Sequence, residues 1–292
     1  MNEREKARGG ASRYNGSEAA PRHRPLILQR PSAMNILVCI KQVPDLEQLP
    51  VDLQADGQIA VGAAPELRMN RFDEFAVEAA LQLKEALAEI HIDVLSVGSE
   101  AVLAVIKRAI GMGVDQGILL DTGDRTDPGP TEVARHIARC AGRKHYDLIL
   151  TGSWSEDGMN GQVGPMTAAL LDRPCATQVM SLKLALDRKQ VDVEREVEAG
   201  SRERLQLRLP ALLALQSGIN RPRYPSLSNL LRANRQAVET LVAEDDAADA
   251  DPVACLGFMQ PPRTRAGRLL EGSPQEKAET FLTLLREKAF IR

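Results

Sequence analysis

Between residue 34 and about residue 225, short apolar runs alternate with longer segments of helical periodicity. The apolar runs carry few polar residues, and they include "NILVCIKQV", "IDVLSVG", "GILLD" and "YDLILTG". A strand that is apolar at almost every position is buried on both of its faces. Strands of this kind that alternate with helices predict a parallel sheet covered by helices on both faces.

The segments between these strands have the spacing of amphipathic helices. In "DEFAVEAALQLKEALAE", residues 73–89, apolar side chains recur at helical spacing with Glu and Lys opposite them. Asn70 is placed to cap this helix, and Asp73 follows three residues later. Further helices are predicted for "EAVLAVIKRAI", "TEVARHIARCAG" and the run after Gly164. Because "IGMGVDQG" follows a helix rather than a strand, we interpret it as a helix C-cap and turn.

The chain changes character after about residue 180. The runs "SLKLALD", "QVDVEREVEAG" and "RERLQLRLP" alternate polar and apolar residues, which predicts a small antiparallel extension of the sheet. The run "ALLALQSG" then returns to the pattern of a buried strand. Residues 226–240 form a basic, partly amphipathic segment.

The two ends of the chain differ from its middle. Residues 1–33 are Arg-rich and lack periodicity, so we expect a disordered N-terminal extension. Residues 241–272 also lose periodicity and resemble an extended arm, which needs another surface to lie on. The last helix, "SPQEKAETFLTLLREKAF", begins with Ser273 as N-cap, Pro274 at the first position and Glu276 completing a capping box.

The expected fold class is therefore α/β, with a Rossmann-like parallel sheet, helices on both faces, a small antiparallel extension and a C-terminal arm that ends in a helix. We divide the chain into residues 1–33, an α/β domain of residues 34–240, and an arm with its helix in residues 241–292.

Charge and composition exclude several classes of protein. The formal net charge of −3 gives no electrostatic reason to expect nucleic acid as a partner. No apolar run approaches the ~20 residues that span a bilayer. The cysteines form no CxxC pair, which favours buried thiols in a reducing compartment and hence a cytoplasmic protein; they are Cys39, Cys140, Cys175 and Cys255. The four histidines show no metal-ligand spacing, so no metal site is predicted.

The stretch "YDLILTGSWSEDGMNGQVGPMTAALL" combines a buried strand, a loop with four glycines and a helical run. Glycines and a helix N-terminus can aim backbone N–H groups at a phosphate without a Lys, and Asn160 and Gln162 could add neutral donors. Glu156 and Asp157 disfavour a triphosphate beside them, so a monophosphate or diphosphate fits better. The alternative is a simple connection between strand and helix, since the loop matches neither GxxxxGK[ST] nor GxGxxG.

Catalytic constellations do not occur in the sequence. There is no GxSxG, HExxH or SxxK motif. His91, His136 and His145 fall at helix ends or on helix faces, and Asp157 is better explained as a hydrogen-bonding loop acid than as a general base. These observations favour a binding or carrier protein over an enzyme.

A set of motifs runs in order from Met34 to the C-terminus. The motifs are "MNILVCIKQVPD", "MNRFDEFAVEAALQLKE", "AIGMGVDQGILL", "DLILTG", "EDGMNGQVGPMTAALL", "LPALLALQSGINRPRYPSLSNLLRA" and "TRAG" followed by "KAETFLTLLREK". Together they resemble the β subunit of electron transfer flavoprotein. Residues 1–33 have no counterpart in the usual family pattern.

The resemblance implies half of a heterodimer whose α subunit holds most of the FAD site, while the β subunit binds AMP as a structural ligand. The C-terminal arm would then dock on the α subunit. The implied nucleotide site, for AMP or FAD, comprises Cys39, Asn70, Arg71, Phe72, Asp73, Val97, Val133, Gly152, Ser153, Trp154, Ser155, Glu156, Asp157, Gly158, Met159, Asn160, Gly161, Gln162 and Val163.

The resemblance also implies a recognition loop in residues 215–237, with Leu227 as its hydrophobic anchor. Arg223, Arg232 and Arg235 are expected to surround this anchor. The implied partners are acyl-CoA or related dehydrogenases, which donate electrons, and a membrane quinone oxidoreductase, which receives them.

The nucleotide loop departs from the family pattern. Family members usually read "GKQAIDGD" or close to it, whereas this chain reads "GSWSEDGM", in which Ser153 and Trp154 replace the Lys and the Gln and Met159 replaces the second acid. Trp154 could stack on an aromatic ring. An electron-bifurcating flavoprotein, which binds a second FAD at this site and uses NADH, is therefore an alternative. A stand-alone adenine-nucleotide-binding module or an ATP-using enzyme is a second alternative, although the chain has neither an SGGxDS loop nor a P-loop lysine.

Overall fold

A computed structural model describes residues 33–45, 47, 52–53, 59–60, 66–123, 128–243, 259 and 267–291. Almost all of the N-terminal extension, most of the predicted arm and Cys255 lie outside the described residues. Among the described helices, none is both long and apolar enough to cross a membrane.

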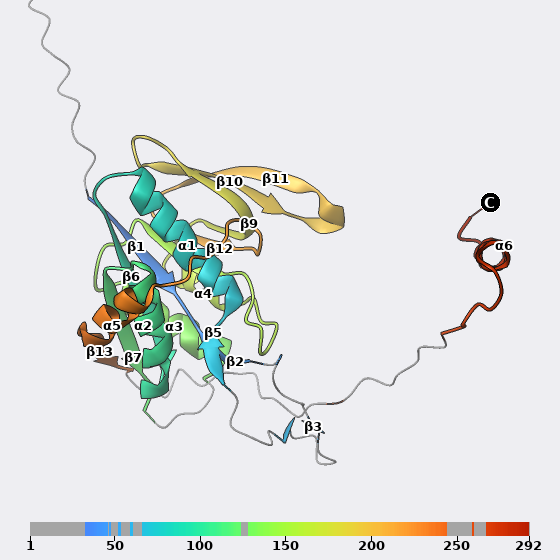
Figure 1. Ribbon diagram of the computed structural model, residues 1–292. Coiled ribbons are helices and arrows are strands. Elements are labelled where there is room, and N and C mark those ends of the chain that lie inside the picture. The colour runs from blue at the N-terminus through green and yellow to red at the C-terminus, as the bar shows by residue number, and fades with distance from the viewer. Residues whose placement is uncertain are drawn as a thin grey trace, which may run out of the picture.

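One nine-stranded sheet forms the centre of the molecule, in the order β11-β10-β9-β12-β8-β1-β6-β7-β13 (Figure 1). The strands from β9 to β13 in this order pair in parallel, and β10 and β11 add an antiparallel edge. The predicted fold class is confirmed. The strands are β1 (Met34–Cys39), β6 (Ile90–Gly98), β7 (Gln116–Asp121), β8 (Leu148–Gly152), β9 (Cys175–Leu184), β10 (Gln190–Glu196), β11 (Arg202–Arg208), β12 (Ala211–Leu215) and β13 (Glu239–Val242).

Helices cover both faces of this sheet. The strand side chains divide into two apolar clusters, and β1 contributes Ile36 and Val38 to one and Leu37 and Cys39 to the other. The first cluster contains residues of α1, α2 and α5, and the second contains residues of α3 and α4. The helices are α1 (Arg71–Ala86), η1 (Glu100–Val102), α2 (Leu103–Met112), α3 (Pro130–Ala141), α4 (Val163–Leu170), η2 (Glu198–Gly200), α5 (Leu227–Arg235) and α6 (Pro274–Glu287).

Two helix ends have the caps that the sequence predicts. Gly113 ends α2 with a φ of 129°, a conformation that favours glycine, so the "IGMGVDQG" segment is a C-cap and turn. At α6, Ser273 and Glu276 form the reciprocal bonds of a capping box and Pro274 follows the cap. In Figure 1, α6 lies apart from the sheet and its helices, and none of its residues is buried.

Some elements were not predicted. Two small two-stranded sheets pair β2 (Gln42–Pro44) with β5 (Leu67–Met69) and β3 (Asp52–Leu53) with β4 (Ile59–Ala60). Strand β13 pairs with β7 and crosses the boundary that we expected at residue 240, so the α/β body continues to Ala243, which is buried. With only four residues, two of them Glu239 and Thr240, this strand has no apolar run that could predict it.

The buried carboxylate of Asp73 joins three elements at one end of the sheet. Its Oδ2 accepts a hydrogen bond from the Lys41 amide (2.7 Å), just after β1, and its Oδ1 accepts one from the Gly152 amide (3.0 Å) at the end of β8. Asp73 itself belongs to the first turn of α1. A side chain at Gly152 would place its Cβ 2.4 Å from Asp73 Oδ1, so only glycine permits this approach.

Burial raises the pKa of Asp73 to about 7, although the hydrogen bonds and the Lys41 ammonium act in the opposite direction. Because the pKa in the folded state is above the ordinary value of 3.8, the folded protein binds this proton more tightly than the unfolded chain does. The contribution of Asp73 to stability is therefore complete below pH ~4 and is lost as the pH rises through about 7.

We predict that Asp73→Ala lowers the free energy of unfolding by about 2–4 kcal/mol at pH 5, because two buried amides lose their acceptor. Because the contribution of Asp73 is lost as the pH rises, the difference in free energy of unfolding between wild type and variant should shrink between pH 5 and pH 8. Urea denaturation followed by circular dichroism at both pH values measures it. The exposed Glu198 of η2 supplies the control, and Glu198→Ala should stay within about 0.5 kcal/mol of wild type. A difference that widens with pH would contradict the assigned direction.

Candidate functional site

The carboxyl ends of β8, β1 and β6 are neighbours in the sheet, and the predicted nucleotide residues gather there. Gly152 ends β8, Cys39 ends β1, and Val97 lies one residue before the end of β6. Val133 of α3 and Val163 of α4 pack against the same apolar cluster as Cys39 and Val97. Helix N-termini and strand ends thus meet at one edge of the sheet, which is where open parallel sheets bind ligands.

The loop of residues 152–163 is folded on itself rather than extended. Ser155 and Asn160 form a bridge, in which the Ser155 amide donates to the Asn160 carbonyl (2.9 Å) and the Asn160 amide donates to Ser155 Oγ (3.3 Å). Residues 156–159 form the turn, and Met159 takes a left-handed φ of 47° at an exposed position. The loop is therefore a turn held by its own hydrogen bonds.

Asn70 and Glu156 hold the loop against the start of α1. Asn70 Nδ2 donates to the Trp154 carbonyl (2.8 Å), and the Glu156 amide donates to Asn70 Oδ1 (3.1 Å). Asn70 occupies the N-cap position but its side chain makes no capping bond, which corrects the capping role expected for it. Instead, Glu156 Oε2 accepts from the Arg71 amide (3.0 Å) and satisfies the helix end.

Basic side chains neutralise both acids of the loop. Lys41 Nζ lies 2.6 Å from Asp157 Oδ2, and Arg68 Nη1 lies 3.1 Å from Glu156 Oε2. Burial alone would raise the pKa of Asp157, but its bond to Lys41 holds that pKa below the ordinary value. The acids therefore repel an anion less than the sequence suggested. We missed Lys41 as a site residue because it is 116 residues away from Asp157; its place in "KQVPD", directly after a buried strand, was the available signal.

Several predicted site residues have structural roles within the chain. Ser153 Oγ is buried, donates to the Ala214 carbonyl (3.1 Å) and accepts from the Gln178 amide (3.2 Å). A Cβ at Gly161 would lie 2.8 Å from the Ser153 carbonyl and 3.5 Å from the Trp154 ring, so this glycine lets the chain pass over Trp154. Gly158, by contrast, has no neighbour closer than 3.7 Å to such a Cβ.

Backbone amides at the junction of the loop and α4 remain available for a ligand. The Asn160 and Gln162 amides bond to Ser155 Oγ and Asn160 Oδ1, whereas the amides of Gly161, Val163 and Gly164 have no hydrogen-bond partner in the part of the chain that the structure describes. The first bond of α4 runs from the Met166 amide to the Gln162 carbonyl, so the Val163 and Gly164 amides form the positive end of the helix.

A buried hydroxyl lies beside these amides. Thr151 Oγ1 makes no hydrogen bond with the described residues, and it would be 2.9 Å from a Cβ at Gly164. These features fit a phosphate group, because free amides and the positive end of a helix attract it, the hydroxyl is unpaired and the acids of the loop are neutralised. The apolar cluster that contains Cys39 would form one wall beside the phosphate. The residues present therefore fit a small nucleotide.

A second feature is residues 221–235, which lie within the predicted recognition loop and which we call the docking segment after that prediction. Leu227 is 73% exposed and Leu231, one turn later in α5, is 55% exposed. Between them Leu230 turns inward, where its Cδ2 would be 2.9 Å from a Cβ at Gly111 of α2. Ser226 caps the helix by accepting from the Asn229 amide (3.2 Å). Leu227 is thus not a core residue of the described chain.

The expected arginines around Leu227 divide into two groups. Arg232 and Arg235 are exposed on α5. Arg223 is not a free charge, because its guanidinium is bonded to Glu78 and Glu85 of α1. The charge of Arg223 is therefore paired within the chain.

The thiols and other polar clusters suggest no further reactive centre. Cys39, Cys140 and Cys175 are free cysteines, and burial raises the pKa of all three, to about 11 for Cys140 and Cys175. The described residues contain no group of three or more His, Cys, Asp or Glu side chains that could hold a metal ion.

Comparison with known proteins gives a consistent result. The model of the electron transfer flavoprotein domain matches residues 60–246. The electron transfer flavoprotein subunit beta of Bacillus subtilis is 36% identical over 267 residues, which cover 88% of this chain and 100% of the relative. The mouse subunit beta is 33% identical over 241 residues (82% of this chain, 93% of the relative), and the Megasphaera elsdenii subunit is 32% identical over 254 residues (82% and 92%). With a domain match across more than half of its length and relatives aligned nearly end to end, the chain belongs to the electron transfer flavoprotein β-subunit family.

Proposed function

We propose that this chain, as the β subunit of a heterodimeric electron carrier, binds AMP at the site formed by the loop and the N-terminus of α4. The observation that carries the proposal is the set of unpaired amides at Gly161, Val163 and Gly164, beside a loop whose acids are already neutralised. These amides would receive the phosphate. The apolar wall of Cys39, Val97 and Val133 would face the rest of the nucleotide.

In this proposal the nucleotide is structural. Asp73, Asn70 and Glu156 tie the loop to α1 and to the strand ends, so a ligand held by the loop would also stabilise the fold that holds it. FAD, held mainly by the α subunit, would supply the redox chemistry. The β chain would contribute its share of the subunit interface and the docking surface for partners.

The docking segment would recognise the electron donors, which we propose to be acyl-CoA or related dehydrogenases, and a membrane quinone oxidoreductase would receive the electrons. Leu227 and Leu231 form an exposed apolar pair on one side of α5, accompanied by the exposed Arg232 and Arg235. One well-placed apolar side chain can carry much of the affinity of a transient interface, and nearby charges steer the encounter.

The C-terminal helix would dock on the α subunit. Helix α6 has a strong N-terminal cap but no buried residue, and it exposes the apolar side chains of Phe281 and Leu282, with the exposed Phe290 following the helix. Since it lies apart from the body of this chain (Figure 1), another surface is needed to cover these side chains.

We predict that the purified α/β complex, when denatured, releases one FAD and one AMP per heterodimer, as identified by mass spectrometry. Two FAD without AMP would overturn the AMP proposal in favour of the bifurcating alternative. Gly161→Ala should lower the retained AMP because its Cβ meets the Ser153 carbonyl, whereas the matched Gly158→Ala, with space around its Cβ, should retain it. Turnover of ATP by the complex would favour an enzyme instead.

We predict that Leu227→Ala weakens docking of the dehydrogenase by about 1–3 kcal/mol. It should raise the apparent KM of the dehydrogenase for the complex and leave flavin content and heterodimer stability unchanged, which steady-state kinetics and absorbance spectra can measure. Leu186, which is 89% exposed in the turn between β9 and β10, is the matched control. If Leu227→Ala instead loses flavin or unfolds, the residue is buried in the complex and does not dock partners.

We predict that a chain ending at Asp245 folds its α/β body but binds the α subunit more weakly than the full chain. Among the residues that the structure describes, the core clusters contain none beyond Ala243, so their packing should be retained. Analytical ultracentrifugation over a dilution series measures the association. Phe281→Ala should weaken it in the same direction, whereas Lys277→Ala on the same helix should not. Equal association of the shortened and full chains would refute the docking of α6.

A further inference from the structure

Glu78 of α1 is a buried carboxylate devoted almost entirely to one arginine of the docking segment. Only 3% of the residue is exposed. Its Oε2 accepts from the backbone amide (3.1 Å) and Nε (2.8 Å) of Arg223, and its Oε1 accepts from Nη2 (2.9 Å). Gln82 adds a fourth bond to Oε1 (3.2 Å). Glu78 thus fixes both the main chain and the side chain of Arg223.

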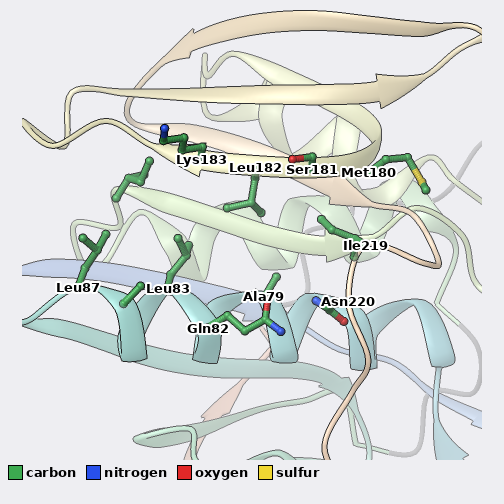
Figure 2. A pocket seen from close by; sticks show the side chains of 12 residues that line it. Ala79, Gln82, Leu83, Leu87, Met180, Ser181, Leu182, Lys183, Ile219 and Asn220 are labelled. Carbon is green, nitrogen blue, oxygen red and sulfur yellow. The ribbon is translucent and has the colours of Figure 1, made fainter.

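The chain just before this arginine borders a cavity. The cavity, of about 350 Å³, lies between α1 and β9, and Ile219 and Asn220 form part of its wall. Figure 2 shows Gln82 and Leu83 of α1 on one side of this cavity and Leu182 and Ile219 on the other. Ile219 packs against the apolar core, and Asn220 is held by a hydrogen bond from its Nδ2 to the Phe75 carbonyl (3.0 Å). Polar contacts with α1 therefore act together with the packing of Ile219 to set the path of the chain into the docking segment.

A second carboxylate of α1 supports the next residue of the segment. Glu74 Oε1 accepts from Arg108 Nη2 (2.9 Å), and the Arg108 guanidinium lies 5.6 Å from the centre of the Tyr224 ring. Glu85 also bonds to Arg223, but its side chain is 61% exposed, so solvent screens this pair. Removal of one partner from a buried pair is far more destabilising than removal of an exposed partner.

We propose that Glu78 is a positioning residue for partner docking: by fixing Arg223, it sets the direction in which Tyr224 and Leu227 leave the body of the protein. The inference rests on the proposed docking function of Leu227. It adds that the affinity for the dehydrogenase depends on a buried residue of α1 that the partner does not touch. Loss of the Glu78 charge leaves the Arg223 guanidinium without its buried partner and frees the segment from α1.

The test compares Glu78→Gln with the matched variant Glu85→Gln in the purified heterodimer. For Glu78→Gln we expect the amides of residues 226–235 to exchange hydrogen about tenfold faster, the effect of about 1.4 kcal/mol of lost local stability. We expect the apparent KM of the dehydrogenase for the complex to rise about tenfold, with kcat and flavin content unchanged. Glu85→Gln should change neither quantity. Arg223→Gln, which alters a half-buried residue, should reproduce the effects if Glu78→Gln does not fold.

A double variant separates this inference from the docking function itself. If Glu78 acts through the placement of Leu227, then Glu78→Gln should raise the KM little further in a Leu227→Ala background. Unchanged exchange in the segment, or full additivity of the two KM effects, overturns the positioning role while leaving the docking function intact. If hydrogen exchange is faster in Glu78→Gln but the KM is unchanged in both Glu78→Gln and Leu227→Ala, the docking function is overturned. The positioning role in docking is then overturned with it.

Discussion

The buried carboxylate of Asp73 is the contact on which the functional end of this protein depends. Asp73 belongs to the first turn of α1, and its carboxylate accepts hydrogen bonds from the amide that follows β1 and the amide that ends β8, two neighbouring strands of the sheet. A carboxylate in this position is costly to bury, and two amide hydrogen bonds and a nearby ammonium offset only part of the cost. With these three chain segments joined, Asn70 and Glu156 can place the loop at the same edge of the sheet.

From that point, α1 carries the rest of the arrangement. Its N-terminus holds the loop through Asn70 and Arg71, and two of its acids, the partly buried Glu74 and the buried Glu78, hold α2 and the docking segment. The sequence predicts an amphipathic helix here, with acids on its polar face. In the structure, Glu74 and Glu78 form hydrogen bonds with Arg108 and Arg223, so these acids do not simply face solvent.

The sequence predicted what depends on local pattern and missed what depends on distant pairs. The two-sided apolar strands, the C-cap at Gly113 and the capping box at Ser273 follow from neighbouring residues, and all are present. The Lys41–Asp157 bond joins residues 116 apart, and the Glu78–Arg223 bond joins residues 145 apart. A local sequence pattern cannot predict either pair. Asn70 lies at the expected cap position, yet its side chain bonds the loop because the loop supplies Glu156 to the helix end in its place.

Cys39, at the end of β1 in the apolar wall of the site, has a chemical consequence for a redox protein. Its buried thiol has a raised pKa, so at neutral pH it stays protonated and has the character of a small apolar side chain. Oxidants and alkylating agents attack the thiolate far more readily than the thiol. Sulfur can therefore lie beside the proposed nucleotide site without becoming a competing site of oxidation, and the reaction of Cys39 with such reagents would report that the sheet had opened.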